Sequence, residues 1–211
     1  MTLRKALAFL RPDLGAASVE AVIVAPMLFV AGCELTDLFL GFRMNGLSYR
    51  GAYAVADAVS RIGDEARLDQ EQIDDLHDLY RFLIKSDGTT SIRVTVVAQD
   101  THPVSGEPVT WIKFSEVAGT EFTGYRVGTA DIPKIRDQIP LLGRADEVII
   151  TETFAQWEPA YIDIGTRDFH EVVVARPRFT QSVDWDDGSG TVLGEGGGPH
   201  DDDPGGTIPD A

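Results

Sequence analysis

The hydrophobic positions in the first third of the chain follow the period of an α-helix. The run from Ala21 to Cys33 carries no charge, and beyond it one helix face repeats at spacings of three and four residues, through Leu38, Phe42, Asn45, Tyr49, Ala52, Ala56 and Val59. We predict one helix from about Ala16 to Arg61. Such a face serves the protein's own core or contacts with neighbouring helices, and both uses stay open. Because Pro26 lacks an N–H group, a kink or a locally melted turn is expected there.

A second amphipathic helix is predicted after Gly63 and the polar run DEARLD. It extends to about Lys85, where Ser86-Asp87-Gly88 ends it, and its apolar positions keep the same spacing at Ile73, Leu76, Leu79, Tyr80 and Leu83.

From Ser91 the pattern changes to short runs rich in Val, Ile, Thr and aromatic residues, separated by Gly, Pro or Asp. These runs are IRVTVVAQ, VTWIKFSEV, EVIITETFAQW and FHEVVVARPRF. They predict an antiparallel sheet with the helices on one face, and therefore an α+β fold. The segment from Asp131 to Gln138 is either a short helix or a long loop between the middle strands.

After Phe179 the chain is dominated by Gly, Asp and Pro and offers almost nothing to bury, which predicts a disordered tail. The expected organisation is a basic leader at 1–15, a long helix at 16–61 with its transmembrane part at about 16–42, an αβ head at 62–180 and a disordered acidic tail at 181–211.

Charge restricts the partners and the orientation. The chain has 34 acidic and 18 basic residues, a net charge of −16, so we exclude nucleic acid, whose phosphates need Lys and Arg. The leader carries Arg4, Lys5 and Arg11 against Asp13. A basic leader before an apolar segment stays in the cytoplasm, so the head would be exported to the periplasm.

Glu20 stands out within the apolar segment. A bilayer span needs about 20 predominantly apolar residues, and 16–42 reaches that length only by including Glu20, Glu34 and Asp37. A carboxylate inside a span costs about 2.5–3.5 kcal/mol on insertion scales. We therefore expect Glu20 to have a partner.

The chain has a basic leader ending in Gly15, a small residue at Ala16, a glutamate five positions after the glycine and a continuous apolar helix. This combination resembles the processing signal of type IV prepilin-like proteins. The stretch GAASVEAVIVAPML resembles the opening of the TadE/TadG-like family of minor pilins, or pseudopilins, which build tight-adherence pili. The matching features are Gly15, Val19-Glu20, the aliphatic run from Val22 to Ala25, and Pro26. Ala21 departs from the pattern, because family members often carry an aromatic residue there.

The resemblance implies that a prepilin peptidase cleaves between Gly15 and Ala16 on the cytoplasmic side. The carboxylate of Glu20 would then pair with the new N-terminal ammonium of a neighbouring subunit and set the register between helices. The implied partners are other pilins and minor pilins, the prepilin peptidase, an inner-membrane pilus assembly platform and membrane lipid. The implied location is the bacterial inner membrane, with incorporation into an extracellular pilus.

Two other interpretations use the same region. Val30-Ala31-Gly32-Cys33 fits a loose lipoprotein box, whereas a lone cysteine on an apolar helix is usually a buried structural residue. The alternative function is an uncleaved or lipidated membrane-anchored periplasmic protein that binds or scaffolds components of a secretion system. An exported hydrolase on a membrane stalk is a third class.

Motifs for catalysis and metal binding are incomplete. His170-Glu171 begins HExxH, but Val174 replaces the second histidine, and Gly119 to Gly124 has P-loop glycine spacing without the following Lys and Ser/Thr. The other histidines, at positions 77, 102 and 200, are scattered. Asp184, Asp186 and Glu195 match only part of a calcium loop. We expect a structural component, not an enzyme, with no catalytic residue, cofactor or metal site.

Overall fold

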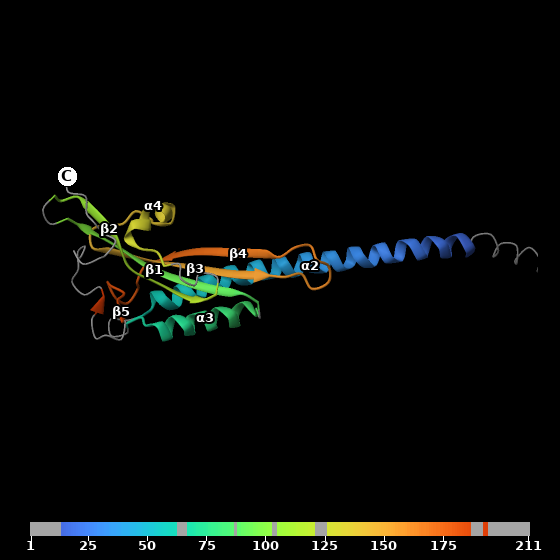
Figure 1. Cartoon of the computed structure of the whole chain (residues 1–211), viewed down its shortest axis with the longest axis horizontal. Coiled ribbons are helices and arrows are strands. Elements are labelled where there is room, and N and C mark those ends of the chain that lie inside the picture. The colour runs from blue at the N-terminus through green and yellow to red at the C-terminus, as the bar shows by residue number, and fades with distance from the viewer. Residues whose placement is uncertain are drawn as a thin grey trace, which may run out of the picture. The chain divides into compact units, whose positions relative to one another are not determined.

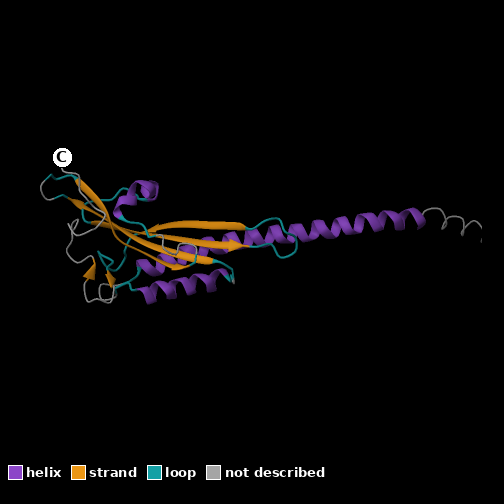
Figure 2. Cartoon of the chain, viewed as in Figure 1, coloured by secondary structure: helices purple, strands orange, loops and turns teal. Residues whose placement is uncertain are grey.

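The computed structural model describes residues 14–62, 67–86, 88–102, 105–120, 126–186 and 192–193. The chain divides into two compact units. One unit comprises residues 1–43 together with Glu158–Thr166, and the other comprises 44–157 together with 167–211. Figure 1 shows the elements along the chain, and Figure 2 distinguishes helices, strands and loops. The two units are described separately below.

The first helix, α2 (Leu14–Ser60), has 47 residues, which at 1.5 Å per residue gives a length of about 70 Å. It corresponds to the helix expected from Ala16 to Arg61. The helical backbone continues through Pro26, so no turn is melted at that position. Pro26 removes only the one hydrogen bond that its missing N–H would have donated to the carbonyl four residues earlier.

The sheet of the second unit has four antiparallel strands in the order β2-β1-β3-β4. Their bounds are Thr90–Thr101 (β1), Pro108–Gly119 (β2), Asp146–Trp157 (β3) and Arg167–Ala175 (β4). The four predicted runs correspond to these strands, but the last strand ends four residues before Phe179. Pro177 explains the difference, because it cannot donate a ladder hydrogen bond and restricts the residue before it.

The pairing of β1 with β2 contains one bulge. Val96 lies opposite Phe114 and Val97 lies opposite Ile112, so the register skips Lys113. A bulge changes the direction in which the extra side chain points. This matters because the side chain of Lys113 is almost fully buried and charged.

One face of the sheet carries the main core. Ile92, Val94 and Val96 of β1 pack with buried residues of α2 and of the second helix, α3 (Gln70–Ile84). The buried helix residues in this cluster are Met44, Val55 and Val59 of α2 with Ile73, Tyr80 and Ile84 of α3. The predicted α+β class, with two long helices packed on one face of an antiparallel sheet, is therefore confirmed.

A residue at each end of α3 terminates the helix, and one buried side-chain contact connects it to α2. Asp69 caps its N-terminus by accepting a hydrogen bond from the backbone N–H of Gln72 at 2.8 Å. Lys85 takes a left-handed conformation at its C-terminus, with φ of 55°. The hydroxyls of Tyr80 and Ser48 are 2.8 Å apart in the interior and connect α3 to α2.

Part of the opposite face of the sheet is covered by residues 127–138, which lie between β2 and β3. Residues Thr129–Asp131, Ile132–Ile135 (α4) and Arg136–Gln138 form three consecutive short helical elements, so the segment is helical and not an extended loop. Ile135 and Val127 pack on Val97, Val148 and Ile150. Both faces of the sheet therefore carry a packed cluster, whereas Val172 and Val174 of β4 are 37% and 40% exposed.

The expectation of disorder is wrong for residues 181–186 and 192–193. Val183 and Trp185 are buried in the main core, and the backbone around them bonds to Leu68 on both sides. Trp185–Asp186 (β5) pairs with Val192–Leu193 (β6). Two buried apolar side chains and these backbone hydrogen bonds thus hold part of this acidic stretch on the head. The rest of the predicted tail lies outside the described residues.

Candidate membrane and assembly helix

The N-terminal part of α2 exposes its apolar side chains in every direction. Between Val19 and Leu35 each large hydrophobic residue is roughly half exposed or more, including Val22 and Phe29 at 73%. In the described part of the chain one helix, within Val19–Ser60, is long and apolar enough to cross a membrane. A helix that is apolar all round and unburied requires lipid or other protein around it. This is the feature of a membrane anchor or a signal sequence.

The predicted processing and assembly residues lie on this helix. Gly15 and Ala16 fall in the first turn of α2, whereas leader residues 1–13 are outside the described part of the chain. Glu20 is exposed, and no hydrogen bond or ion pair to its side chain is found among the described residues. The pairing of Glu20 with a neighbouring subunit and the cleavage after Gly15 stay predictions.

Asp37 has a partner that the sequence did not suggest. Its side chain is fully buried, although it lies on the apolar helix. The carboxylate accepts hydrogen bonds from three consecutive backbone N–H groups of the β3–β4 loop (Glu158–Thr166): Ala160 at 2.9 Å, Tyr161 at 3.1 Å and Ile162 at 2.9 Å. Successive N–H groups that converge on one point bind an anion well. We call this arrangement the helix–loop contact.

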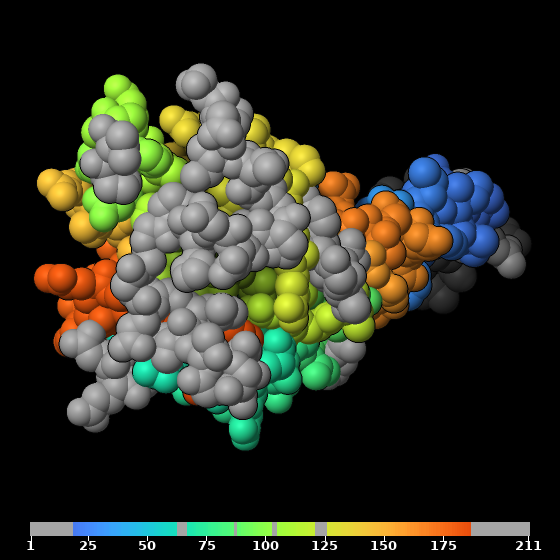
Figure 3. Space-filling model, turned by 60° about the vertical axis from the view of Figure 1, so that its left-hand side comes forward, coloured from blue at the N-terminus to red at the C-terminus, as the bar shows by residue number. Residues whose placement is uncertain are grey.

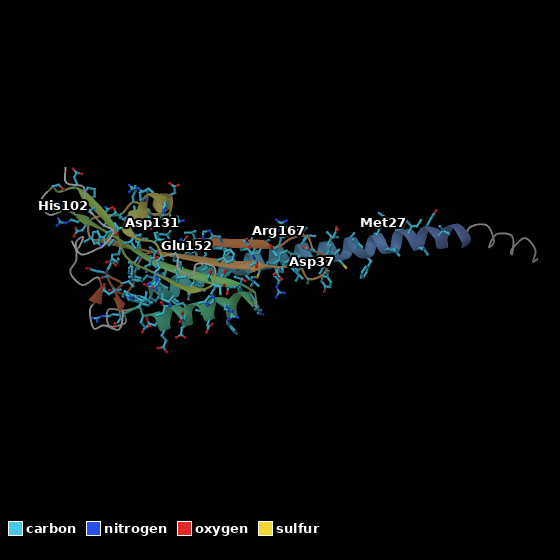
Figure 4. All side chains as sticks on the ribbon, in the orientation of Figure 1. Met27, Asp37, His102, Asp131, Glu152 and Arg167 are labelled. Atoms are coloured by element: carbon cyan, nitrogen blue, oxygen red, sulfur yellow. The ribbon has the colours of Figure 1, made fainter. Side chains whose placement is uncertain are left out.

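The helix–loop contact is visible in two views. Figure 4 labels Asp37 where the loop meets α2, and labels Met27 on the bare part of the helix. The orange loop lies against the blue helix in Figure 1 and in the rotated space-filling view of Figure 3. A charge within an apolar helix was the available signal, since the reasoning that gave Glu20 a partner applies equally to Asp37. Its partner could not be identified, because any backbone offers N–H groups.

Apolar exposure continues along α2 on both sides of Asp37. Leu35, Leu38, Phe39 and Phe42 recur at spacings of three and four and are between 46% and 68% exposed. Tyr49 and Tyr53 are about half exposed, with ring centroids 4.7 Å apart and hydroxyls 3.1 Å apart. Exposed apolar surface of this extent on a monomer marks a contact with a partner or with lipid.

The histidines considered for catalysis that the structure describes contact neighbouring residues of the fold. His170 lies in strand β4, not on a helix, and its Nε2 is 3.3 Å from the carboxylate of Glu152. His77 lies near Thr90, and burial lowers the pKa of its ring. Among the described residues no three His, Cys, Asp or Glu side chains are grouped so that they could hold a metal ion. His200, Glu195 and most of Gly119 to Gly124 lie outside the described residues.

A buried ion pair joins the two central strands of the sheet. Arg93 of β1 donates from Nε to Glu152 of β3 at 2.6 Å, and both side chains are at most 5% exposed. Burial alone would raise the pKa of the Glu152 carboxyl, but the hydrogen bond from His170 and the charge and hydrogen bond of Arg93 outweigh it and lower the pKa. This pair joins two neighbouring strands.

Comparison with known proteins identifies no relative of this chain. It matches no family model, no curated protein and no solved structure. The architecture alone carries the likeness. A long apolar N-terminal helix followed by an antiparallel sheet that packs on its second half is consistent with a pilin-like fold.

Proposed function

We propose that this protein is a minor pilin or pseudopilin of a tight-adherence pilus, similar to the TadE/TadG-like family. It would be held in the bacterial inner membrane by the N-terminal part of α2, with its N-terminus in the cytoplasm and its head in the periplasm. Its role would be structural, in the assembly or priming of the pilus, without catalysis.

The observation that carries the proposal is the division of α2 into two differently used halves. From Val19 to Leu35 the helix is apolar and uncovered, whereas from Met44 to Val59 one face is buried in the core of the head. A simple anchor needs only enough apolar length to cross the bilayer. A helix that continues from such a segment directly into the head suits a subunit that moves from lipid into a helical bundle, because both surroundings accept the same apolar surface.

The exposed residues beyond Asp37 support contact with other helices. Leu38, Phe39 and Phe42 lie at the outer end of the predicted span, whereas Tyr49 and Tyr53 are about half exposed past the length that a bilayer requires. An isolated anchor gains nothing from exposed aromatic residues there, whereas helix packing buries them and gains roughly 25 cal/mol for each Å² removed from water. We infer that other pilins cover this surface.

The lipoprotein interpretation has less support. Cys33 is partly buried and lies near the middle of an unbroken helix, so cleavage before it would separate the apolar segment from the head. Glu20 would also lie within the apolar core of the signal.

The N-terminus of the protein recovered from its own cells tests the proposal. Intact mass and N-terminal sequencing are expected to show a chain that starts at Ala16, in a membrane or pilus fraction that contains other pilins. A retained N-terminus on protein found only as single molecules would refute the proposal in favour of an uncleaved anchor. A lipid adduct on Cys33 would establish the lipoprotein instead.

A further inference from the structure

The distance along the axis of α2 from its N-terminal end to the helix–loop contact can be compared with the thickness of a bilayer. Asp37 follows Glu20 by 17 positions, and this corresponds to about 26 Å along the helix axis. It follows Leu14, the first residue of α2, by 23 positions, or about 35 Å. The hydrocarbon core of a bilayer is about 30 Å thick. A span that begins near Glu20 or in the first turn of α2 therefore ends close to Asp37.

The loop itself cannot lie in hydrocarbon. Residues 158–166 form neither helix nor strand, and irregular backbone exposed to lipid would leave polar groups without partners. Glu158 and Asp163 are also exposed on the loop and need water or polar head groups around them. The helix–loop contact therefore marks the outer limit of the membrane-spanning segment.

The same loop exposes residues suited to the membrane surface. Tyr161 is 63% exposed although its backbone N–H is bonded to Asp37, and Ile164 is 39% exposed. Tyrosine concentrates at the boundary between hydrocarbon and water, where its ring lies among acyl chains and its hydroxyl meets the head groups. Here the backbone of Tyr161 is bonded to Asp37 on the helix, so the position of its ring along α2 is restricted.

We propose that the Glu158–Thr166 loop binds the head-group region of the bilayer, with Tyr161 as its anchor and Asp37 as the positioning residue that holds the loop at that depth on α2. The loop thereby sets how far the helix inserts. This inference rests on the membrane placement of α2 in the proposed function. The partner is the polar surface of the lipid bilayer, and the exposed acidic residues on the loop favour zwitterionic over anionic lipid.

A depth measurement on the full-length protein tests this inference. With Cys33→Ser as background, a fluorophore is attached through Asp163→Cys in phosphatidylcholine vesicles. Lipids with a spin label in the head group or at the middle of the acyl chain are the quenchers, and iodide reports exposure to water. We expect head-group quenching to exceed mid-chain quenching by about twofold or more, since the anchor lies at the interface.

Substitutions then test the role of Tyr161 as the lipid anchor separately from the role of Asp37 as the residue that positions the loop. Asp37→Ala, which releases the loop, and Tyr161→Ser, which removes the ring, are each expected to abolish the preference for the head-group quencher and to increase quenching by iodide. Glu34→Ala and Tyr53→Ser are the matched controls, because they remove an exposed acid and an exposed tyrosine outside the loop. These controls are expected to leave the quenching unchanged.

A second label distinguishes this inference from the proposed function. A fluorophore attached through Leu28→Cys reports whether α2 spans the bilayer and is expected to be quenched by the mid-chain lipid. If this label behaves as expected while the loop label responds only to iodide, the loop does not bind lipid and the inference is overturned. If neither lipid quenches the Leu28→Cys label, the membrane placement fails, and the proposed function fails with it.

Discussion

Lys113 donates a hydrogen bond to Asp184, a residue 71 positions later, with 2.8 Å between Nζ and Oδ1. The same ammonium reaches the hydroxyl of Ser182 at 2.7 Å and the carboxylate of Glu147 at 2.9 Å. The side chain of Lys113 is 4% exposed. The bulge at this position directs one cation inward, where it fastens the acidic C-terminal segment to the sheet.

We predict that Lys113→Met destabilises the head by about 3 kcal/mol, because two largely buried carboxylates lose their shared cation. Thermal unfolding of the full chain in detergent, followed by tryptophan fluorescence, measures the loss. Lys134→Met is the control, since Lys134 is exposed and pairs with Asp131 on the surface. It is expected to change stability by no more than about 0.5 kcal/mol. Equal stability of the two variants would contradict this role of Lys113.

Stability is predicted to fall with pH in the acid range. Burial alone would raise the pKa of Asp184, but hydrogen bonds from Lys113 and Ser182 outweigh it and hold the pKa below its usual range. The pKa of Glu152 is also lowered. A carboxyl with a lowered folded-state pKa stabilises the fold above its ordinary pKa of about 4, and that contribution disappears as pH falls through the folded value.

Unfolding experiments between pH 7 and pH 2 should therefore show a small decline below about pH 6.5, where burial disfavours the charged form of His77, and a steeper loss below about pH 4 as the carboxyls gain protons. In Asp184→Asn this acid-range loss should be smaller, because the titrating carboxyl is absent. An unchanged pH profile in that variant would show that Asp184 does not contribute.

Periodic elements of this protein follow from its sequence, since hydrophobic spacing alone locates α2, α3 and the four strands of the larger sheet. The contacts that involve isolated residues do not. The bulge at Lys113 has no local signature, and Val183 and Trp185 are too sparse to indicate a buried segment within a stretch rich in Gly and Asp. The bare apolar helix of the candidate site was predictable, but the helix–loop contact was not, because Asp37 binds backbone N–H groups more than 120 positions away.

Gly51 is predicted to be necessary for the close approach of α2 and α3. A Cβ atom on Gly51 would lie 3.0 Å from Ile84 Cγ2 and 3.0 Å from the ring of Tyr80, whose hydroxyl is fixed by Ser48. Gly46 has open space around its Cα. We expect Gly46→Ala to stabilise the helix by up to about 1 kcal/mol. Gly51→Ala should be less stable than Gly46→Ala by about 1–3 kcal/mol, because the added methyl group overpacks the interface.

Denaturant unfolding of both glycine variants, with the tryptophans as probe, measures this difference. If Gly51→Ala were as stable as Gly46→Ala, the two helices would have room to separate, and the close packing of Gly51 against α3 would not limit stability.

Glu20 is predicted to act in assembly and not in membrane insertion. Removing a charge from an apolar segment makes insertion easier, so Glu20→Ala should enter the membrane at least as well as the natural chain. If the carboxylate binds the N-terminal ammonium of a neighbouring subunit in a medium of low dielectric, its loss leaves that ammonium unpaired. We therefore expect about a tenfold or greater loss of the protein from pili or minor-pilin complexes, equivalent to at least about 1.4 kcal/mol of association energy.

Glu34→Ala is the matched control for Glu20→Ala, because Glu34 is an exposed acid on the same helix that the processing signal does not include. Membrane fractionation measures insertion, and the amount of protein recovered with sheared pili or in cross-linked complexes measures assembly. We expect Glu20→Ala to insert normally but to assemble less, whereas Glu34→Ala should be normal in both measurements. Normal assembly of Glu20→Ala at normal protein levels would mean that the carboxylate has no partner in a neighbouring subunit.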